Sequence, residues 1–533
     1  VPGPEDFSSG FQAPPTPGRR NTVWCENAPP VVLDVRHTPQ QPRENAPFKV
    51  TARVTDPDGV AQVTLSYQIV LPGQYIPSRL PLERNVLLSR PQTERPINPA
   101  FEDPANWITI SMHDDGTAGD EVAGDHIYTV ILPGQINRTL VRYRIKACDE
   151  KGMEVRVPYA DDPSLNFACF VYNGVPPYVA TLRSVHPEGR GHVYPVEVMT
   201  SLPVFILITR KEDYQQCVAY NQSYQIPKSN EEARDKFNWN GTFVYQGVVY
   251  DHIKYRLRQA NDRYGAHGKR AFRIRFNKGH YLQAHDNYGR PFPKKWRTIN
   301  TGKMFDNKRV GNFGLTETIN HMLWNMVGVP APYVFTFHFR IVQGPEEVPK
   351  GPYGQYLGDF WGMALCFEDY DARFIETHNM PDGNLYKLKD GVFDGNELKR
   401  NQGRYSVKDD SDFQNIRHNL RPNRSDEWLN KHVNWDEWNR YHAVVEAIRH
   451  YDFKPSDTHS KNRAWFFEPY PGSPYGRLWL LPWDSDASWG PNWNQGIDYP
   501  KNAIFSGRGR EPYKMNYRNN IREFRDLIWT REV

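Results

Sequence analysis

Two kinds of hydrophobic pattern divide the chain. From Pro29 to about Asn173, apolar residues recur at every second position in short runs such as "FKVTARVTD", "AQVTLSYQIV", "HIYTVIL" and "VRYRIKACD". A period of two is typical of strands with one buried face, and turn residues separate these runs. The pattern therefore predicts an all-β sandwich of the immunoglobulin or fibronectin type over residues 29–173.

From about Val175 the pattern is mixed. "PVFILIT", "IKYRLR", "AFRIRF" and "YVFTFHF" are strand-like, whereas "LTETINHMLWNMVG" has helical spacing and ends at Gly328. The apolar face of this predicted helix consists of Leu315, Ile319, Met322, Leu323 and Met326. A later helix is predicted in "DEWNRYHAVVEAIRHYD". Strands followed by helices favour an α+β, bilobal domain over residues 195–533, preceded by a linker at 174–194. The Pro/Gly-rich residues 1–28 are interpreted as an extended arm.

Polar residues flank a predicted hairpin, before its first strand and after its second strand. "KPSDTHSKNRAWFF" (454–467) and "LLPWDSDASWG" (480–490) each join a strand to a polar loop. This arrangement places Asp457, Asn462, Asp484 and Asp486 at one end. Asp457 and Asn462 have the D-x-x-x-x-N spacing of a protein-kinase catalytic loop, where the Asp accepts a hydroxyl proton and the Asn holds a metal. The pattern is short, and the alternative is that these side chains only cap turns.

Two further features point to anionic ligands. In "IKYRLR" and "KRAFRIRF" apolar residues alternate with basic ones, so a hairpin of the two strands would have one strongly basic face. That face suits a triphosphate; the alternative is an ordinary solvated sheet face. Glu317, His321 and Trp324 lie opposite the apolar face of the predicted helix. In kinases a helix glutamate pairs with a strand lysine, although a solvent-facing glutamate near a helix start is also common.

Composition narrows the function classes. The 533 residues carry a net charge of only +4, which gives no argument for nucleic-acid binding. No apolar stretch is long enough for a membrane span. The sequence does not open with a basic and then apolar segment, so we expect any signal peptide to have been removed or to lie outside this sequence. Cys148 and Cys169 bound a predicted strand pair. They either form a disulfide, which would indicate an oxidising compartment, or remain buried thiols.

Several stretches, in order along the chain from Pro195 to the end, resemble the CotH kinase family, named after spore-coat protein H. They are "SLPVFILIT", "YRLRQANDRYGAHGKRAFRIRFNKG", "GLTETINHMLWNMVGVPAP", "GMALCFEDYDARFIETHNMPDGNLYKLKDG", "SDTHSKN" and "LPWDSDASWG". The resemblance implies an atypical protein-kinase fold that phosphorylates Ser/Thr with ATP and Mg²⁺ or Mn²⁺. One departure is that the family's Arg-Gly after the first basic strand is Arg258-Gln259 here, so the phosphate-facing turn is built differently.

The resemblance also implies roles for individual residues. Lys269 would contact phosphates and Glu317 would orient it, while Asp457 would be the catalytic base. Arg258 and Arg273 of the basic strands, together with Glu368, would contribute to the nucleotide pocket. Asn462 and Asp484 would be metal ligands, with Asp486 as a supporting carboxylate.

The predicted sandwich has its own motif, "HDDGTAGDEVAGDHIYT" (113–129), which is similar to a loop of secreted bacterial immunoglobulin-like modules. Asp114, Asp115, Asp120 and Asp125, spaced by glycines, offer oxygens to Ca²⁺. The equally open alternative is a turn rich in Asp and Gly with no ion.

The sequence thus predicts a secreted or cell-surface CotH-type Ser/Thr kinase that acts on extracellular or coat proteins. The alternative is a catalytically inactive extracellular adhesion or scaffold protein with the same fold. A glycosidase dyad is disfavoured, because the basic strands attract anions rather than neutral sugars.

Overall fold

A computed structural model describes residues 26–90, 92–180, 192–218, 238–258, 271–302, 314–348, 358–387, 399–420, 424–448, 450, 462–485 and 488. The chain forms two compact units. The first contains Val1–Asp262, Phe272–Leu282 and Phe337–Met363, and the second contains Arg263–Ala271, Gln283–Thr336 and Ala364–Val533. The structure is mainly β-sheet with a few helices. The predicted domain boundaries follow sequence patterns and stay predictions.

The N-terminal part of the first unit consists of antiparallel strands in two sheets. One sheet has the order β1-β2-β5, and the other has the order β4-β3-β6-β7 with β8 also paired to β6. The strands are β1 (Val31–Thr38), β2 (Phe48–Thr55), β3 (Val60–Val70), β4 (Ile108–Ser111), β5 (Ile127–Leu132), β6 (Leu140–Asp149), β7 (Glu154–Val157) and β8 (Phe167–Phe170). Short helices α1 (Arg84–Ser89), α2 (Pro99–Glu102) and η2 (Pro104–Asn106) lie between β3 and β4 in the chain. The four alternating runs of the sequence are thus confirmed as β2, β3, β5 and β6.

The two sheets share one hydrophobic core. Val50 and Val54 of β2 are buried in the same cluster as Tyr143 and Ile145 of β6. The immunoglobulin-like assignment of this sandwich stays a prediction.

The rest of the first unit adds strands β9 (Tyr178–Ala180), β10 (His192–Tyr194), β11 (Val204–Ile208), β12 (Trp239–Tyr245), β13 (Val248–Leu257) and β14 (Phe272–Arg275), with helices α3 (Val196–Met199) and α4 (Lys211–Val218). β11, β12, β13 and β14 pair antiparallel in this order, and β11 pairs parallel with β16 (Val334–Val342). Lys254 lies opposite Arg275, and Arg256 opposite Arg273, while Tyr255 opposite Ile274 is buried. The predicted hairpin with one basic and one apolar face is confirmed.

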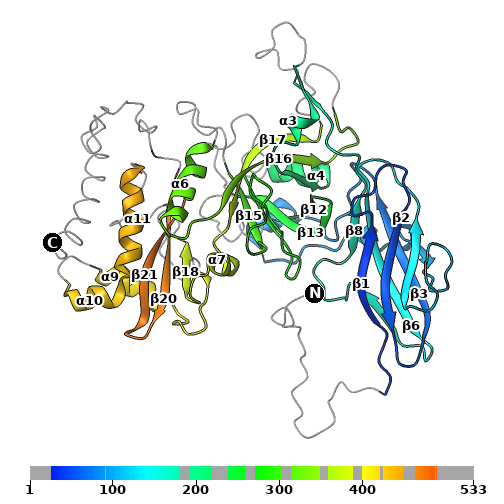
Figure 1. Ribbon diagram of the computed structural model, residues 1–533, viewed down its shortest axis with the longest axis horizontal. Coiled ribbons are helices and arrows are strands. Elements are labelled where there is room, and N and C mark those ends of the chain that lie inside the picture. The colour runs from blue at the N-terminus through cyan, green and yellow to red at the C-terminus, as the bar shows by residue number, and fades with distance from the viewer. Residues whose placement is uncertain are drawn as a thin grey trace. The chain divides into compact units, whose positions relative to one another are not determined.

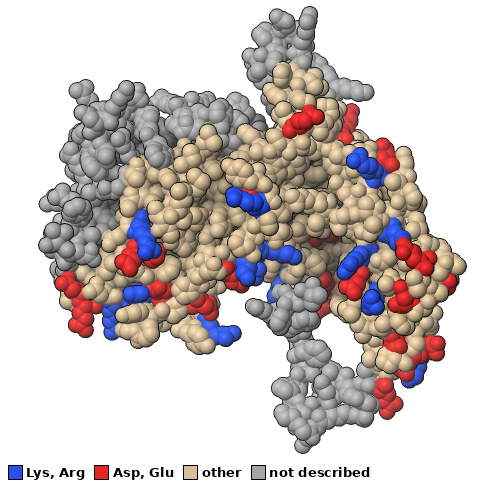
Figure 2. Space-filling model, in the orientation of Figure 1, with Lys and Arg blue, Asp and Glu red and all other residues tan. Residues whose placement is uncertain are grey.

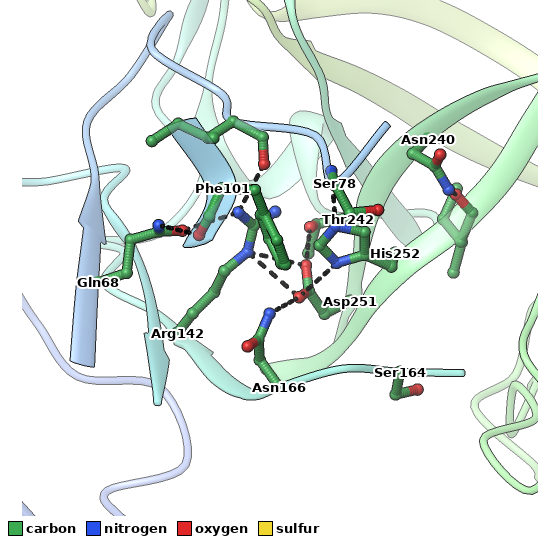
Figure 3. Close-up of polar contacts among 12 residues, drawn as sticks. Gln68, Ser78, Phe101, Arg142, Ser164, Asn166, Asn240, Thr242, Asp251 and His252 are labelled. Carbon is green, nitrogen blue, oxygen red and sulfur yellow. Dashed lines mark hydrogen bonds and ion pairs between the residues drawn. The ribbon is translucent and has the colours of Figure 1, made fainter. Parts of the chain in front are cut away.

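A buried polar cluster joins β6 to the β12–β13 hairpin within the first unit (Figure 3). Arg142 on β6 is fully buried, and its Nε lies 3.1 Å from Oδ2 of Asp251 on β13. Oδ1 of Asp251 accepts a hydrogen bond from Thr242 at 2.6 Å, whereas Oδ2 accepts one from Asn166 at 2.9 Å and lies 2.8 Å from His252 Nδ1. Burial alone raises the pKa of Asp251, but Arg142 and His252 more than offset it, so this carboxyl stays ionised far below its ordinary range.

The second unit contains a four-stranded antiparallel sheet with the order β19-β18-β20-β21, of which Figure 1 labels β18, β20 and β21. It also contains a strand pair, β15 with β17. The strands are β15 (Thr298–Gly302), β17 (Phe360–Glu368), β18 (Asn384–Lys387), β19 (Lys399–Asn401), β20 (Arg463–Tyr470) and β21 (Ser473–Pro482). Of β17, only the part that begins at Ala364 belongs to the second unit. The helices are α6 (Leu315–Met326), α7 (Ala372–Thr377), α9 (Ser411–Asn419), α10 (Asp426–His432) and α11 (Trp435–Ala447). Helices α9, α10 and α11 pack on β21, and α11 also contacts α6. The β20–β21 hairpin, α6 and α11 were all predicted from the sequence.

Of the two alternatives for Cys148 and Cys169, the structure favours free thiols. Cys148 and Cys169 are both free thiols. Cys169 on β8 lies opposite Val141 of β6, and Cys148 lies opposite Glu154 of β7. Cys148 and Val141, the residue opposite Cys169, are seven positions apart on β6. Since residues of one strand are spaced by about 3.4 Å, Cys148 and Cys169 are roughly 24 Å apart along the strand, far beyond disulfide reach. The argument for an oxidising compartment that this bond supplied is therefore lost.

Candidate functional site

Asn462 directly precedes β20 and Asp484 lies two residues after the end of β21, so both residues belong to the same end of the hairpin. Arg463 and Pro482 form the last strand pair, and the next backbone contact is the Trp483 N–H donating to the Asn462 carbonyl at 3.2 Å. Asn462 and Asp484 have φ angles of 58° and 52°, in the left-handed region that Asn and Asp tolerate better than most side chains. Because such conformations concentrate at functional sites, the geometry supports a functional hypothesis for this hairpin end. Asp457 and Asp486 lie outside the described residues.

The orientation predicted for helix α6 is wrong. Leu315, Met322 and Met326 are 60%, 53% and 71% exposed, whereas Glu317 is 5% and Trp324 0% exposed. The Trp324 ring stacks on Tyr441 of α11, in the large core of this unit. The polar and aromatic face of the helix is therefore the packed face.

This inverted orientation attaches α6 to the chain that follows Asp484. The buried side chain of Asn320 donates from Nδ2 to the carbonyl of Ser485 and to Oγ of Ser488, both at 2.7 Å. One turn earlier on the same helix lies Glu317, whose carbonyl accepts a hydrogen bond from His321 Nδ1 at 2.8 Å. Glu317 is therefore buried on the helix face that holds the segment after Asp484. Lys269, its predicted partner, lies outside the described residues.

Glu368 ends β17 in a buried polar arrangement. Its Oε2 lies 2.9 Å from Nε2 of His378 and accepts from the Tyr333 N–H at 3.3 Å, while the His378 ring stacks on Tyr333. Its second oxygen, Oε1, is buried and has no hydrogen-bond partner among the described residues. The structure thus places an acceptor at the end of β17, where the family resemblance expects the nucleotide pocket.

Lys387 is a cation that the sequence reasoning missed. Its Nζ lies 3.2 Å from the centroid of the Trp483 ring and 3.8 Å from Oδ1 of Asp369. Asn300 in turn donates to Asp369 at 2.9 Å. The quoted stretch "GNLYKLKDG" already contained this lysine after an apolar strand, but nothing in its spacing connected it to Asp484.

Carboxylates crowd the chain after β17. Burial, and then the neighbouring carboxylate of Asp369, raise the pKa of Asp371 to about 7, although α7 backbone N–H groups donate to it. Asp369 is thus one of several acidic groups close together at the end of β17, and Lys387 is a cation in contact with it.

The remaining predicted residues lie in the first unit. Arg258 directly follows β13, and Arg273 lies on β14; both are half-buried.

On the face shown in Figure 2, basic and acidic side chains of the described residues are intermixed, in keeping with the small net charge of +4. Among the described helices, none has the length and apolar character needed to span a membrane.

The acidic loop of the first unit brings three predicted ligands together. Asp114, Asp120 and Asp125 each have an oxygen within 4.8 Å of the others. The same carboxylates also accept backbone hydrogen bonds: Asp114 from Asp125 N–H at 3.1 Å, and Asp120 from Gly116 N–H at 2.8 Å. The geometry is compatible both with an ion and with a turn stabilised by its own side chains.

The fold and site define the class only broadly, as a multidomain, mainly β protein with a carboxylate residue and an amide residue at the same end of one hairpin. Comparison with protein families is more specific, because the family described as CotH kinase protein matches residues 265–529. This part of the chain belongs to that family, and the resemblance drawn from the sequence motifs is confirmed. A search of curated proteins finds no match to the chain. Membership implies kinase chemistry with ATP and a divalent metal in general terms, and a protein substrate.

Proposed function

We propose that this protein is a secreted or cell-surface CotH-type kinase that transfers the γ-phosphate of ATP to Ser or Thr of an extracellular or coat protein. The observation that carries the proposal is the end of the β20–β21 hairpin, where the Trp483 N–H donates to the Asn462 carbonyl and Asp484 follows Trp483; both Asn462 and Asp484 lie inside the segment that matches the family. An amide and a carboxylate oxygen are the hard ligands that Mg²⁺ and Mn²⁺ prefer, so the donor set fits the implied metal. The bound metal would neutralise phosphate charge.

Each predicted residue then has one task in the transfer. Asp457 accepts the proton of the substrate hydroxyl, whose oxygen forms a new bond to the γ-phosphorus as the bond from that phosphorus to the β–γ bridging oxygen breaks and ADP leaves. Lys269, oriented by Glu317, contacts the phosphates. Arg258, Arg273 and Glu368 contribute to the nucleotide pocket, and Asp486 supports the metal ligands.

The extracellular location rests on the sandwich loop alone, since the four described cysteines are free. Asp114, Asp120 and Asp125 lie close enough together to share one cation, and we propose Ca²⁺ as its identity. In this proposal the N-terminal sandwich docks the kinase to its surroundings.

Two substitutions in the full-length protein test the kinase assignment. Asp484→Asn keeps the side-chain volume but removes a negative charge from the metal site, so metal-dependent ATP binding and transfer should both fall, transfer by roughly 100-fold or more. Asp457→Asn removes the base, so transfer should fall while ATP affinity survives. The measurements are ATP affinity, transfer of labelled phosphate to a Ser/Thr-rich acceptor with Mg²⁺ or Mn²⁺, and melting temperature.

Asp436→Asn, at an exposed position of α11, is the matched control. If Asp484→Asn and Asp457→Asn both match this control in affinity and transfer, the assignment of the two aspartates is wrong. If the parent protein labels neither itself nor the acceptor, the alternative function is favoured: an inactive adhesion or scaffold protein with the CotH fold.

A further inference from the structure

The position of Lys387 follows from the alternation of strand β18. Successive side chains of a strand point to opposite faces, so Leu385 and Lys387 share one face and Tyr386 occupies the other. Leu385 packs in a core cluster with Leu481 and Trp483. Tyr386 belongs to a separate cluster, on the side of the sheet that packs against the helices. Lys387 therefore lies on the face of the sheet where Trp483 lies.

The register of the sheet places Lys387 at the end of the β20–β21 hairpin that carries Asn462 and Asp484. Lys387 is opposite Ala464 on β20, and Ala464 follows Asn462 by two residues. On the next strand Leu481 is opposite Ala464, three residues before Asp484. Because neighbouring strands are about 4.8 Å apart, the lysine backbone lies close to the residues that end the hairpin.

The ammonium group of Lys387 is held by the residue that immediately precedes Asp484. Its Nζ is 3.2 Å from the Trp483 ring centroid and 3.8 Å from Oδ1 of Asp369. The side chain is 16% exposed, so the charge is not dispersed into bulk water. A contact with an aromatic face and one carboxylate would by itself be a modest structural tie.

The surrounding charge favours a larger role. Glu368, Asp369 and Asp371 follow one another within a few residues, and Asp484 lies beyond Trp483. A nucleotide bound among these carboxylates brings further negative charge, which requires a compensating cation that is already in place. A lysine ammonium acts as a point charge on phosphates and reaches them without the fixed geometry that arginine needs.

We propose that Lys387 contributes positive charge to the triphosphate of the bound nucleotide, and that Trp483 and Asp369 hold it in position. This inference rests on the proposed function, since it requires a nucleotide site at the Asn462–Asp484 end of the hairpin. It adds a nucleotide-binding residue within the second unit to the basic residues expected from the sequence.

The test compares nucleotides of graded charge on the full-length protein. Affinities for ATP, ADP, AMP and adenosine are measured with Mg²⁺ for the parent, Lys387→Met, Lys387→Gln and Lys387→Arg. Loss of a charge near the phosphates should lower ATP affinity by about tenfold or more, change adenosine affinity by less than about twofold, and give intermediate effects for ADP and AMP. Lys387→Arg should retain most of the ATP affinity because the charge is kept.

Lys399→Met is the matched control. This lysine lies on the neighbouring strand β19, with its Nζ 5.3 Å from the Tyr386 ring centroid, and it donates to the carbonyls of Lys408 and Asp409. It shares the lysine–aromatic contact but lies against the other face of β18. Its removal should leave the ATP-to-adenosine affinity ratio unchanged.

The possible failures are distinguishable. If the parent binds ATP and transfers phosphate but Lys387→Met and Lys387→Gln keep ATP affinity within twofold, the role of Lys387 is refuted and the kinase assignment stands. An equal loss of affinity for ATP and for adenosine also refutes the proposal, because a purely structural role of Lys387 would affect charged and uncharged ligands alike. If the parent binds no nucleotide, the proposed function and this inference fail together. Should Lys387→Met fail to fold, as judged by its melting temperature, Lys387→Gln decides.

Discussion

Replacing Arg142 by Met tests whether the N-terminal sandwich and the β12–β13 hairpin are stabilised by one shared buried network. The substitution keeps much of the apolar stem but removes the guanidinium group that contacts Asp251 (Figure 3). It also removes donors to Oε1 of Gln68 at 3.0 Å and to the carbonyl of Ile76 at 2.7 Å. Asp251, only 3% exposed, would remain as a buried carboxylate without its cation.

The expected cost follows from leaving that charge unpaired. Removing one partner of a buried ion pair destabilises a protein by about 3–5 kcal/mol, because the remaining charge is buried without its counter-charge. Replacing both partners costs less, since no unpaired charge remains. For a unit of this size, 1 kcal/mol corresponds to a melting-temperature shift of roughly 2 °C, so Arg142→Met should lower the first unit's melting temperature by about 6–10 °C. Asp251→Asn should cost a similar amount. The double variant should recover roughly 1–3 kcal/mol relative to the sum of the single effects.

The pH dependence has a defined sign. The folded-state pKa of Asp251 is held below its ordinary value of 3.8 by Arg142 and His252 acting against burial. The contribution of the pair is therefore complete above about pH 4 and is lost only as the pH falls through the lower folded-state value. In Arg142→Met burial acts on Asp251 without Arg142 to oppose it, so the pKa of this carboxyl rises and the carboxyl protonates at a higher pH than in the parent. The difference between the parent and Arg142→Met should accordingly be largest at neutral pH and shrink as the pH falls.

The assay is thermal and denaturant unfolding of the full-length parent, both single variants and the double variant at pH 7. Hydrogen exchange at the amides of β6 and β13 would locate the change within the first unit. Single variants within about 1 kcal/mol of the parent would refute the argument. Additive effects in the double variant would show that Arg142 and Asp251 act independently.

Three further predictions concern other parts of the chain. Trp324→Ala should destabilise the second unit by about 3–5 kcal/mol, whereas Met326→Ala on the exposed face of α6 should stay within about 0.5 kcal/mol; equal costs in denaturant unfolding would contradict the observed helix orientation. Burial, and then Lys431, lower the pKa of His432 to about 4 from 6.5, so the unfolded chain binds a proton between these values that the folded chain does not. Stability should therefore fall as the pH drops from 6.5 to 4, and His432→Gln should flatten the melting-temperature profile over this interval. If the acidic loop binds Ca²⁺, chelation should lower the melting temperature of the parent and leave Asp120→Asn unaffected; no shift in the parent would identify a turn without an ion.

The secondary structure was largely predictable because its signals are local. The alternation of apolar and basic residues in "IKYRLR" and "AFRIRF" predicted β13 and β14, and the register with Lys254 opposite Arg275 produces the expected two faces. The turn residues after Phe467 predicted the hairpin, and β20 and β21 extend a few residues further toward a tight turn at Tyr470 and Ser473. Such patterns depend on neighbours a few positions away, which the sequence displays directly.

The candidate site was predictable only in part. That Asn462 and Asp484 belong to the same end of one hairpin follows from their places before and after its strands, and the structure has this hairpin, with the Trp483 N–H donating to the Asn462 carbonyl. Their role as metal ligands stays a prediction. Lys387 could not be connected to them, because its distance from Trp483 depends on the pairing of β18 with β20, strands far apart in the sequence. The catalytic roles of these residues stay predictions until the proposed substitutions are measured.

Residue types at fixed local spacings are enough to predict most of the strands and helices and the family to which residues 265–529 belong. Which face of an element is buried depends instead on tertiary packing. The apolar stripe of α6 indicated one packing face, yet Asn320 and Trp324 on the other face found their partners in Ser485 and Tyr441. Likewise Arg142 has the strand alternation of a solvent-facing residue, and it is buried because Asp251, more than a hundred residues later, supplies its counter-charge. Burial is a property of what lies opposite, and that information is not contained in the pattern of any one segment.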